Sequence, residues 1–468
     1  MEAIRLWDTN IWSFIVSMAL LFGAMMLANM LRRSIPFLRR SLIPSSVIAG
    51  FLVLAAAGLW RLLTKTPMFD AVTLEALTYH GLGLGIVAMT LQSQEKVKGK
   101  EARRDIFNTS LTTVSTYLIQ AVAGLALTIV LSYLIGSWAQ SGILLPMGFG
   151  QGPGQAFNWG NTFMTENGFE NGASFGLSVA AMGFLAASIG GVIYLNVAAK
   201  KGLKRDENAD EKEKLDLAVF TTRDEIPLSE SLDKLTVQFA LVFVCYGVAY
   251  GLMVALSLLL DALGGFFVNT VKPLLWGFNF LMGMMVASIV KFILKRSRKK
   301  GIIHREYTSN FLLTRISGLM FDIMVVASIA AIDLSAFTHP EFIVPLLTIS
   351  IAGTLLTFFY VRFVSKKLFP TYRHAEFLVM YGMLTGTAST GLILLREIDP
   401  LYETPAAHNM IYQNLYSIIF GAPMLLMLGV VAQSMQMAYV TLGVLVFMLV
   451  AMVLLLFRSF LFKKRRKG

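Results

Sequence analysis

Long apolar runs separated by short polar segments dominate the chain, and they determine the first interpretation of its fold. A helix that crosses a membrane needs about 20 mostly apolar residues. Eleven segments meet that requirement, and each is expected to form one helix. They cover residues 11–31, 46–64, 74–92, 108–135, 172–199, 234–260, 270–293, 311–332, 342–365, 409–432 and 435–460. The pattern therefore predicts an all-α polytopic membrane protein.

Two further apolar segments, about 142–165 and about 375–397, are interrupted by glycine, threonine and serine. In hydrocarbon, each backbone group without a hydrogen-bond partner costs several kcal/mol, so irregular backbone persists only inside protein or beside a water-filled cavity. We expect both segments to be re-entrant hairpins that enter and leave the membrane on the same side.

Composition and charge agree with a membrane protein. Of 468 residues, 56% are hydrophobic and 15% are charged, whereas soluble domains are about a quarter charged. The net charge of +12 arises from basic residues in alternate loops, at 32–40, 96–104, 200–234, 291–305, 362–373 and 458–467. Basic loops are typically cytoplasmic. The distribution of charge therefore indicates orientation in the plasma membrane, with the N-terminus outside and the C-terminus in the cytoplasm. It does not indicate nucleic-acid binding.

The order of these elements occurs twice. Residues 1–199 and 234–432 each contain four spans, a broken segment and a fifth span, and residues 200–233 form a polar cytoplasmic linker. Residues 433–468 add an extra helix and a basic tail. Because five is odd, the second repeat enters the membrane from the opposite side. Inverted repeats are common in secondary transporters, whose sites lie at discontinuous helices near the membrane centre.

The broken segments carry the candidate binding groups. Free helix N-terminal N–H groups suit a carboxylate, and carbonyl and hydroxyl oxygens suit Na⁺. The candidates for substrate binding are Gly150, Gln151, Gly152, Gly154, Gln155, Thr387, Ser389, Thr390, Arg396, Asn409 and Gln413. The candidates for Na⁺ are Asn158, Ser174, Asp322, Thr385, Gly386 and Asn414. The alternative is that small residues only allow close helix packing, which we favour for Gly81, Gly83 and Gly85.

Charged residues within the apolar segments are few. Asp322 lies near the middle of 311–332, where a carboxylate indicates either ion coupling or a buried structural pair. Arg396 follows the second broken segment and either binds a substrate carboxylate bidentately or belongs to the cytoplasmic basic rim. Glu376 and Glu397 flank the same segment, and we expect both to be solvated.

Other functional classes find less support. The five histidines are scattered and no paired acidic residues or Ser/His/Asp spacing is visible, so a membrane enzyme is disfavoured. The single cysteine, Cys245, excludes an intrachain disulfide. A phosphate loop at Gly150–Gly154 would need a preceding strand and a soluble helix, yet both flanks are apolar. No cofactor is expected.

Three motifs resemble the sodium/glutamate symporter family: "GFGQGPGQAFNWG" with the following "ENGFENGASFGLSVAAMGFLAASIGG", "IPSSVIAG" (43–50), and "GTASTG". The likeness covers residues 11 to about 432. Gln151 and Pro153 stand where better-known members have His and Thr, and helix 435–460 is additional. The resemblance implies Na⁺-coupled symport of glutamate or a related small carboxylate, a homodimer and an elevator-like movement. A proton-coupled carboxylate transporter with Asp322 as carrier is the alternative.

Overall fold

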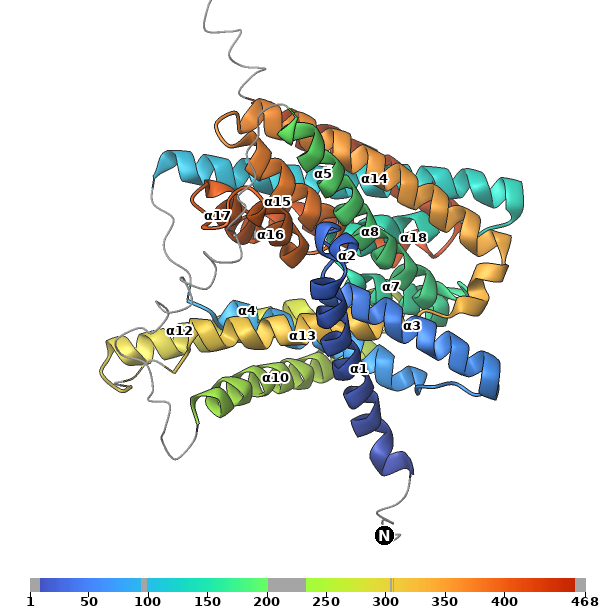
Figure 1. The fold of residues 1–468 in the computed structure, drawn as a ribbon, viewed down its shortest axis with the longest axis horizontal. Helices are drawn as coiled ribbons and strands as arrows, with labels where there is room; N and C mark the ends of the chain where they lie inside the picture. Colours follow the sequence, from blue (N-terminus) through green and yellow to red (C-terminus); the bar gives the residue numbers. More distant parts are fainter. Residues whose placement is uncertain (1–8, 94–98, 201–232, 304, 306, 459–468) are drawn as a thin grey trace, which may run out of the picture. The chain divides into compact units, whose positions relative to one another are not determined.

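The structure, a computed structural model, describes residues 9–93, 99–200, 233–303, 305 and 307–458 (Figure 1). Within these ranges every regular element is helical and no strand occurs. The predicted cytoplasmic linker, apart from residues 200 and 233, and the basic tail from 459 onward lie outside the described residues.

The helices before the linker are α1 (Thr9–Ser34), α2 (Pro36–Arg40), α3 (Ser45–Thr64), α4 (Ala71–Leu91), α5 (Lys100–Ile135), η1 (Ser141–Ile143), α6 (Leu144–Gly150), α7 (Pro153–Asn167) and α8 (Gly172–Ala199). Those after it are α10 (Lys234–Leu263), η2 (Phe267–Val271), α11 (Lys272–Gly277), α12 (Asn279–Lys299), α13 (Asn310–Ala330), η3 (Leu334–Thr338), α14 (Pro340–Leu368), α15 (Arg373–Thr385), α16 (Ala388–Arg396), α17 (Pro405–Tyr412), α18 (Asn414–Val431) and α19 (Met435–Leu456).

Length and apolar character confirm the polytopic all-helical prediction. Among the described residues, nine helices are long and apolar enough to cross a membrane, and up to eleven if each of two bent helix pairs counts as one span. Both predicted interruptions are present, because α6 and α7 separate at residues 151–152 and α15 and α16 separate at 386–387.

For two segments the prediction of one continuous helix is wrong, because each is bent in the structure. The segment 270–293 bends by 63° between Gly277 and Asn279, and the segment 409–432 bends by 48° near Gln413. The first bend follows a π-helical turn and Pro273, and both features commonly bend helices. Hydropathy alone misses such bends because the residues on both sides of them remain apolar.

Helix α5 begins at Lys100, earlier than the predicted start at residue 108. Its first turns contain charged residues such as Glu101 and Arg103, which are good helix formers but have no place in hydrocarbon. The apolar window therefore marks the membrane part of the helix, and the helix itself extends beyond it.

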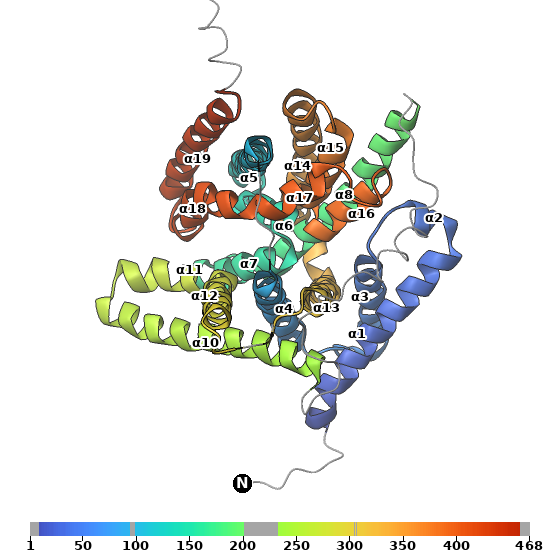
Figure 2. The same cartoon turned by 90° about the vertical axis from the view of Figure 1, so that its left-hand side faces the viewer.

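The chain divides into two compact units, and each takes helices from both sides of the linker. Unit 1 comprises Met1–Leu27, Ala49–Lys96 and Glu213–Ala331, and unit 2 comprises Ala28–Ile48, Val97–Lys212 and Ile332–Gly468. Within unit 1, α4 packs against α13, α12 and α10 (Figure 2). Its core includes Val87, Ala249 and Val286.

Glycines allow close packing inside unit 1, as predicted for Gly81, Gly83 and Gly85. A β-carbon on Gly81 would lie 2.9 Å from Cβ of Met324, and one on Gly85 would lie 2.5 Å from the ring of Phe321. The space next to α4 is thus filled by side chains of α13, which supports the packing interpretation for these glycines.

Within unit 2, α5 packs against α14 and α19, and α15 packs against α16, α14 and α8. Tyr194 of α8 stacks on Phe377 of α15, with ring centroids 3.8 Å apart, and Phe377 stacks on Tyr381 one turn later. This aromatic column joins helices from both halves of the chain around the second interruption.

Candidate functional site

The first break, Gln151–Gly152, separates α6 from α7. Gly152 has φ = +86°, a left-handed conformation that glycine adopts at little cost and other residues rarely adopt. Pro153 occupies the first turn of α7, where its missing N–H group would have had no intrahelical partner. The sequence Gln-Gly-Pro therefore ends one helix and starts the next within two residues.

The second break, Gly386–Thr387, separates α15 from α16. Thr387 is the N-cap of α16, since its hydroxyl oxygen accepts from the Thr390 N–H at 3.5 Å and lies 3.3 Å from the Thr390 hydroxyl. Such caps satisfy one of the free N–H groups in a first helical turn. The second break is thus made by one glycine and one capping threonine.

The two breaks touch each other inside unit 2. A β-carbon on Gly152 would lie 3.4 Å from Cγ2 of Thr387 and 4.0 Å from the carbonyl oxygen of Gly386. The structure therefore brings together three predicted site residues from the two broken segments. It also places the N-termini of α7 and α16 at adjoining breaks.

Helix α8 provides the room for both broken helix pairs through glycines spaced seven residues apart. A β-carbon on Gly183 would lie 2.3 Å from the Thr385 carbonyl oxygen and 3.1 Å from the Phe149 ring. One on Gly176 would lie 2.1 Å from the carbonyl oxygen of Ala156 in α7. Only glycine fits at such contacts with backbone. The small-residue character of α8 is thus required for the breaks to lie where they do.

Helix α5 binds the carbonyl groups that precede both breaks. The Tyr117 hydroxyl donates to the Gly150 carbonyl oxygen at 2.9 Å, and Gln120 Nε2 donates to the Leu384 carbonyl oxygen at 2.9 Å and to Thr357 Oγ1 at 2.8 Å. Carbonyls in the last turn of a helix lack intrahelical partners. Sequence reasoning missed both residues, although a glutamine one turn beyond a run of serines and threonines in an apolar helix was the available signal.

The polar residues of the first broken segment are mostly enclosed. Gln155 is 1% exposed and Asn158 is 3% exposed, and Gly150 and Gly154 are also buried. Gln151, at the break itself, is half-buried. Amides at this depth in an apolar protein indicate either a structural network or a ligand site.

The second broken segment has both buried and exposed hydroxyls. Thr385 and Thr390 are fully buried, whereas Ser389 is exposed. The Thr385 hydroxyl donates to the Tyr381 carbonyl oxygen at 2.7 Å, which leaves its oxygen available as an acceptor. Ser174 of α8 already accepts from the Asp333 N–H at 2.9 Å.

Asn409 bonds away from the breaks, whereas Gln413 also reaches the last turn of α15, where its Nε2 donates to Met383 Sδ at 3.8 Å. Asn409 Nδ2 donates to the Tyr372 hydroxyl at 3.0 Å, and Gln413 Nε2 donates to Asn414 Oδ1 at 2.8 Å. The Gln413 carbonyl oxygen accepts from the Ser110 hydroxyl of α5 at 2.8 Å. These bonds tie α17 and the start of α18 to α5 and to the residues before α15.

Three charged residues differ in their surroundings. Arg396, at the end of α16, donates from Nε to the Tyr402 hydroxyl at 2.6 Å. Asp322 lies on α13 in unit 1 and is exposed. Glu376 is 1% exposed, so the expectation that it is solvated is wrong. An acidic residue in a first helical turn is usually solvated, but here α5 and α17 cover it.

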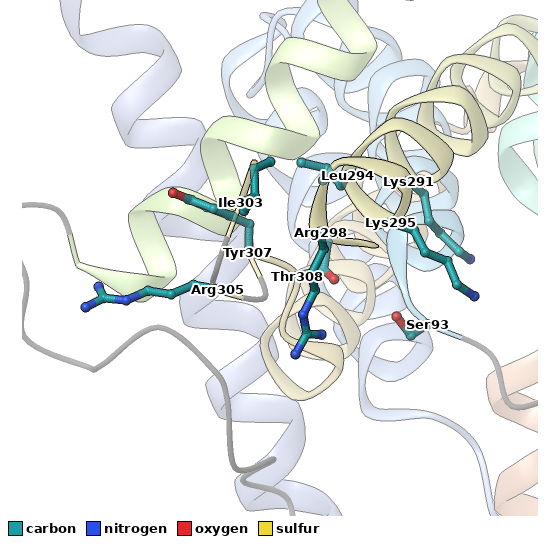
Figure 3. Close-up of a pocket in the computed structure, with 9 residues that line it drawn as sticks. All are labelled: Ser93, Lys291, Leu294, Lys295, Arg298, Ile303, Arg305, Tyr307 and Thr308. Atoms are coloured by element: carbon teal, nitrogen blue, oxygen red, sulfur yellow. The ribbon is translucent and has the colours of Figure 1, made fainter. Parts of the chain in front are cut away.

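Unit 1 has a basic cavity of about 240 Å³, lined by Ser93, Lys291, Leu294, Lys295, Arg298, Ile303, Arg305, Tyr307 and Thr308 (Figure 3). Lys291, Lys295 and Arg298 point toward the side of Ser93, whereas Arg305 points away (Figure 3). Lys291 Nζ donates to the carbonyl oxygens of Thr90 at 3.0 Å and Gln92 at 2.6 Å. Lys291 therefore binds two carbonyl groups at the end of α4.

Metal-binding groups of the usual kind are not gathered in the part of the chain that the structure describes. No group of three or more His, Cys, Asp or Glu side chains is placed there to hold a metal ion. A cation at the breaks would instead use carbonyl, hydroxyl and amide oxygens, the ligand types that transporters with broken helices offer to Na⁺.

Comparison with known proteins adds one finding. The model of the sodium/glutamate symporter family matches residues 10–375, which is more than half of the chain. The matched region contains the first break and ends before the second, so the likeness of "GTASTG" to that family stays a prediction. A comparison with curated proteins finds no match to this chain.

Proposed function

Because the chain belongs to the sodium/glutamate symporter family, we propose that it is a Na⁺-coupled secondary transporter of glutamate or a related small carboxylate. Family membership and the many apolar helices together make it a multi-pass membrane protein. The observation that carries the proposal is the contact between Gly152 and Thr387, because it joins two helix breaks from distant parts of the chain in one site.

The chemistry of the two breaks suits an anion. Helices α7 and α16 both start at the breaks, and the first N–H groups of a helix lack intrahelical partners and carry a partial positive charge. One of these groups, the Thr390 N–H, is already capped by Thr387. The others, with Gln151 at the first break, Gln155 from α7 and Ser389 from α16, would bind the substrate carboxylate.

The same breaks offer oxygen atoms to Na⁺. Each carbonyl oxygen has two lone pairs, so those of Gly150 and Leu384 keep acceptor capacity after bonding to α5. We assign Na⁺ to oxygen atoms of Thr385, Gly386, Asn158 and Ser174. Enclosed oxygens of this kind bind a cation without competition from water.

The topology belongs to the same proposal. We place both broken helix pairs in the membrane as re-entrant hairpins within inverted repeats at 1–199 and 234–432, with residues 433–468 outside the repeat. The order of helices around each break supports this assignment. Unit 2, which holds both breaks, would carry the substrate in an elevator-type cycle, and the protein would form a homodimer in the plasma membrane.

Uptake into proteoliposomes tests the function. Radiolabelled glutamate, aspartate and other small carboxylates are offered with an inward Na⁺ gradient or an inward proton gradient, each imposed alone. We expect the Na⁺ gradient to drive uptake of at least one of them. Uptake driven only by protons would refute Na⁺ coupling, and no uptake of any carboxylate would refute the symporter assignment.

Variants link the activity to the breaks. Gln155→Ala should abolish Na⁺-driven uptake, while Thr165→Ala, an exposed position later on α7, should leave uptake unchanged. Asp322→Asn tests the alternative of proton coupling. Loss of proton-driven uptake in this variant is expected only if Asp322 carries the proton.

Site-specific labelling tests the topology. With Cys245 replaced by alanine, single cysteines at the exposed positions Glu170 and Lys299 are treated with a membrane-impermeant thiol reagent in intact cells. The proposed orientation predicts labelling at Glu170 only. With the N-terminus outside, a first broken segment that crossed the membrane once would give labelling at Lys299 only, and that result would exclude the re-entrant first hairpin.

A further inference from the structure

A buried acidic side chain in unit 2 has no role in the site at the breaks. Glu376, in the first turn of α15, is 1% exposed. Its Oε1 accepts from the Thr109 hydroxyl of α5 at 2.9 Å. A buried carboxyl group within an apolar protein is costly unless it is neutral or paired, so its surroundings decide its chemical state.

Two buried acceptor atoms in this cluster lack hydrogen-bond partners among the residues that the structure describes. They are Glu376 Oε2 and Asn409 Oδ1, and Asn409 is fully buried. One of the two N–H groups of the Asn409 amide is used, because Nδ2 donates to the Tyr372 hydroxyl at 3.0 Å. Buried polar atoms are rarely left unsatisfied in proteins, so two in one cluster call for a missing donor.

In the part of the chain that the structure describes, no cation forms a salt bridge with Glu376. Asp105 of α5 accepts from the Tyr372 hydroxyl at 2.7 Å, which adds a second carboxyl group to the cluster. Arg104 is 3.4 Å from Asp105, and both the arginine and this contact lie at the surface side of the cluster. Among the described residues, Glu376 itself forms no salt bridge.

The basic residues near α15 face elsewhere. His374 bonds to the Tyr194 hydroxyl of α8 at 2.9 Å, and Arg373 is exposed with Nε 3.3 Å from His374 Nε2. Arg362 of α14 interacts electrostatically with Tyr194. A Glu376 carboxylate would therefore be a buried anion facing a second acid, whereas the carboxylic acid would supply the hydrogen that the acceptors lack.

We propose that Glu376 is a proton-binding site that shares its proton with Asn409 Oδ1, and that Na⁺-driven uptake requires this proton. The reaction is a simple exchange, in which the carboxylic acid releases a proton to water and the carboxylate later takes one up. Tyr372 and Asp105 connect the cluster to the surface, since the Asp105 side chain is 14% exposed. The requirement for uptake rests on the proposed transport function, whereas proton binding itself does not.

Glu376→Gln tests the proposal because its amide keeps a donor for Asn409 and cannot ionise. Na⁺-driven uptake is measured in proteoliposomes with the same pH on both sides, from acidic to alkaline pH. Wild-type uptake should fall by about tenfold per pH unit once the carboxyl group loses its proton. Glu376→Gln should remain active without that fall. Glu397→Gln, a half-buried acid at the other end of the hairpin, is the matched control and should keep the wild-type profile.

Infrared difference spectroscopy of the purified protein supplies a readout that does not depend on transport. The wild type should show the C=O stretch of a buried protonated carboxyl group that titrates with pH, and Glu376→Gln should lack it while Glu397→Gln retains it. The same band in Glu376→Gln, or a wild-type pH profile of uptake in that variant, would overturn the proposal. If the wild type transports nothing, the proposed function fails, yet the infrared band still decides whether Glu376 binds a proton.

Discussion

Several glycines in unit 2 lie directly against backbone carbonyl groups, whereas the nearest neighbours of the closely packed glycines in unit 1 are side chains. In unit 1, β-carbons on Gly83 and Gly85 would each lie 2.5 Å from a ring carbon, of Tyr246 and of Phe321 respectively. In unit 2, β-carbons on Gly142 and Gly183 would lie 2.0 Å and 2.3 Å from backbone carbonyl oxygens. A side chain can rotate away from an added methyl group, but a carbonyl within a packed helix cannot.

This difference indicates that the position of the backbone is most tightly constrained in unit 2, around the two helix breaks. The breaks in unit 2 are held by glycines of α8 and by hydrogen bonds from Tyr117 and Gln120, all of which act on backbone atoms. Unit 1 has the side-chain packing of an ordinary helix bundle. We therefore expect a methyl group added at a packed glycine to lower the free energy of unfolding more in unit 2 than in unit 1.

The largest effect is expected for Gly183→Ala in unit 2. The added methyl group would overlap the Thr385 carbonyl oxygen and the Phe149 ring, so we expect a loss of at least about 3 kcal/mol in the free energy of unfolding. Na⁺-driven uptake should also be lost. Reversible unfolding in mixed detergent measures the stability. Gly251→Ala in unit 1, where nothing lies within 4 Å, is the matched control and should be neutral or slightly stabilising.

A smaller loss is expected for Gln120→Leu in unit 2. The change removes the bonds to Thr357 and the Leu384 carbonyl and leaves both groups buried, at a cost of about 1–3 kcal/mol. Uptake should fall further than stability alone explains, because the carbonyl lies just before the second break. Equal uptake per folded molecule in variant and wild type would show that α5 does not position this break.

Gly85→Ala in unit 1 should cost about 1–2 kcal/mol in unfolding free energy, since the Phe321 ring must move. A second change, Phe321→Leu, should restore part of the loss by making room. If Phe321→Leu does not restore stability, side chains in unit 1 do not adjust to an added methyl group. The proposed difference in tolerance between the two units would then be wrong.

The smallest effect is expected at the surface of unit 1. Lys272 Nζ lies 2.7 Å and 2.8 Å from the two oxygens of Asp261, and both side chains are partly exposed. Such a pair contributes about 0.5 kcal/mol or less. Asp261→Asn should therefore change the unfolding free energy by no more than that, and high salt should reduce even this difference.

Much of the architecture was predictable because hydropathy and backbone breakers are local properties. The long helices and both breaks follow from residues that are neighbours in the chain, and so does the likeness around Gly148–Gly160, which lies inside the family match. The bends at Gly277–Asn279 and near Gln413 escaped notice because the sequence remains apolar through them.

The sequence by itself determined that this chain is a helical membrane protein with two interrupted segments rich in glycine and polar residues. Only the tertiary structure decided that Gly152 meets Thr387, that Tyr117 and Gln120 bind the carbonyls beside the breaks, and that Glu376 is buried. Asp322 stood out in the sequence but is exposed on unit 1. The physical reason is that burial and hydrogen bonding depend on which helix faces pack together, and residues hundreds of positions apart supply those faces.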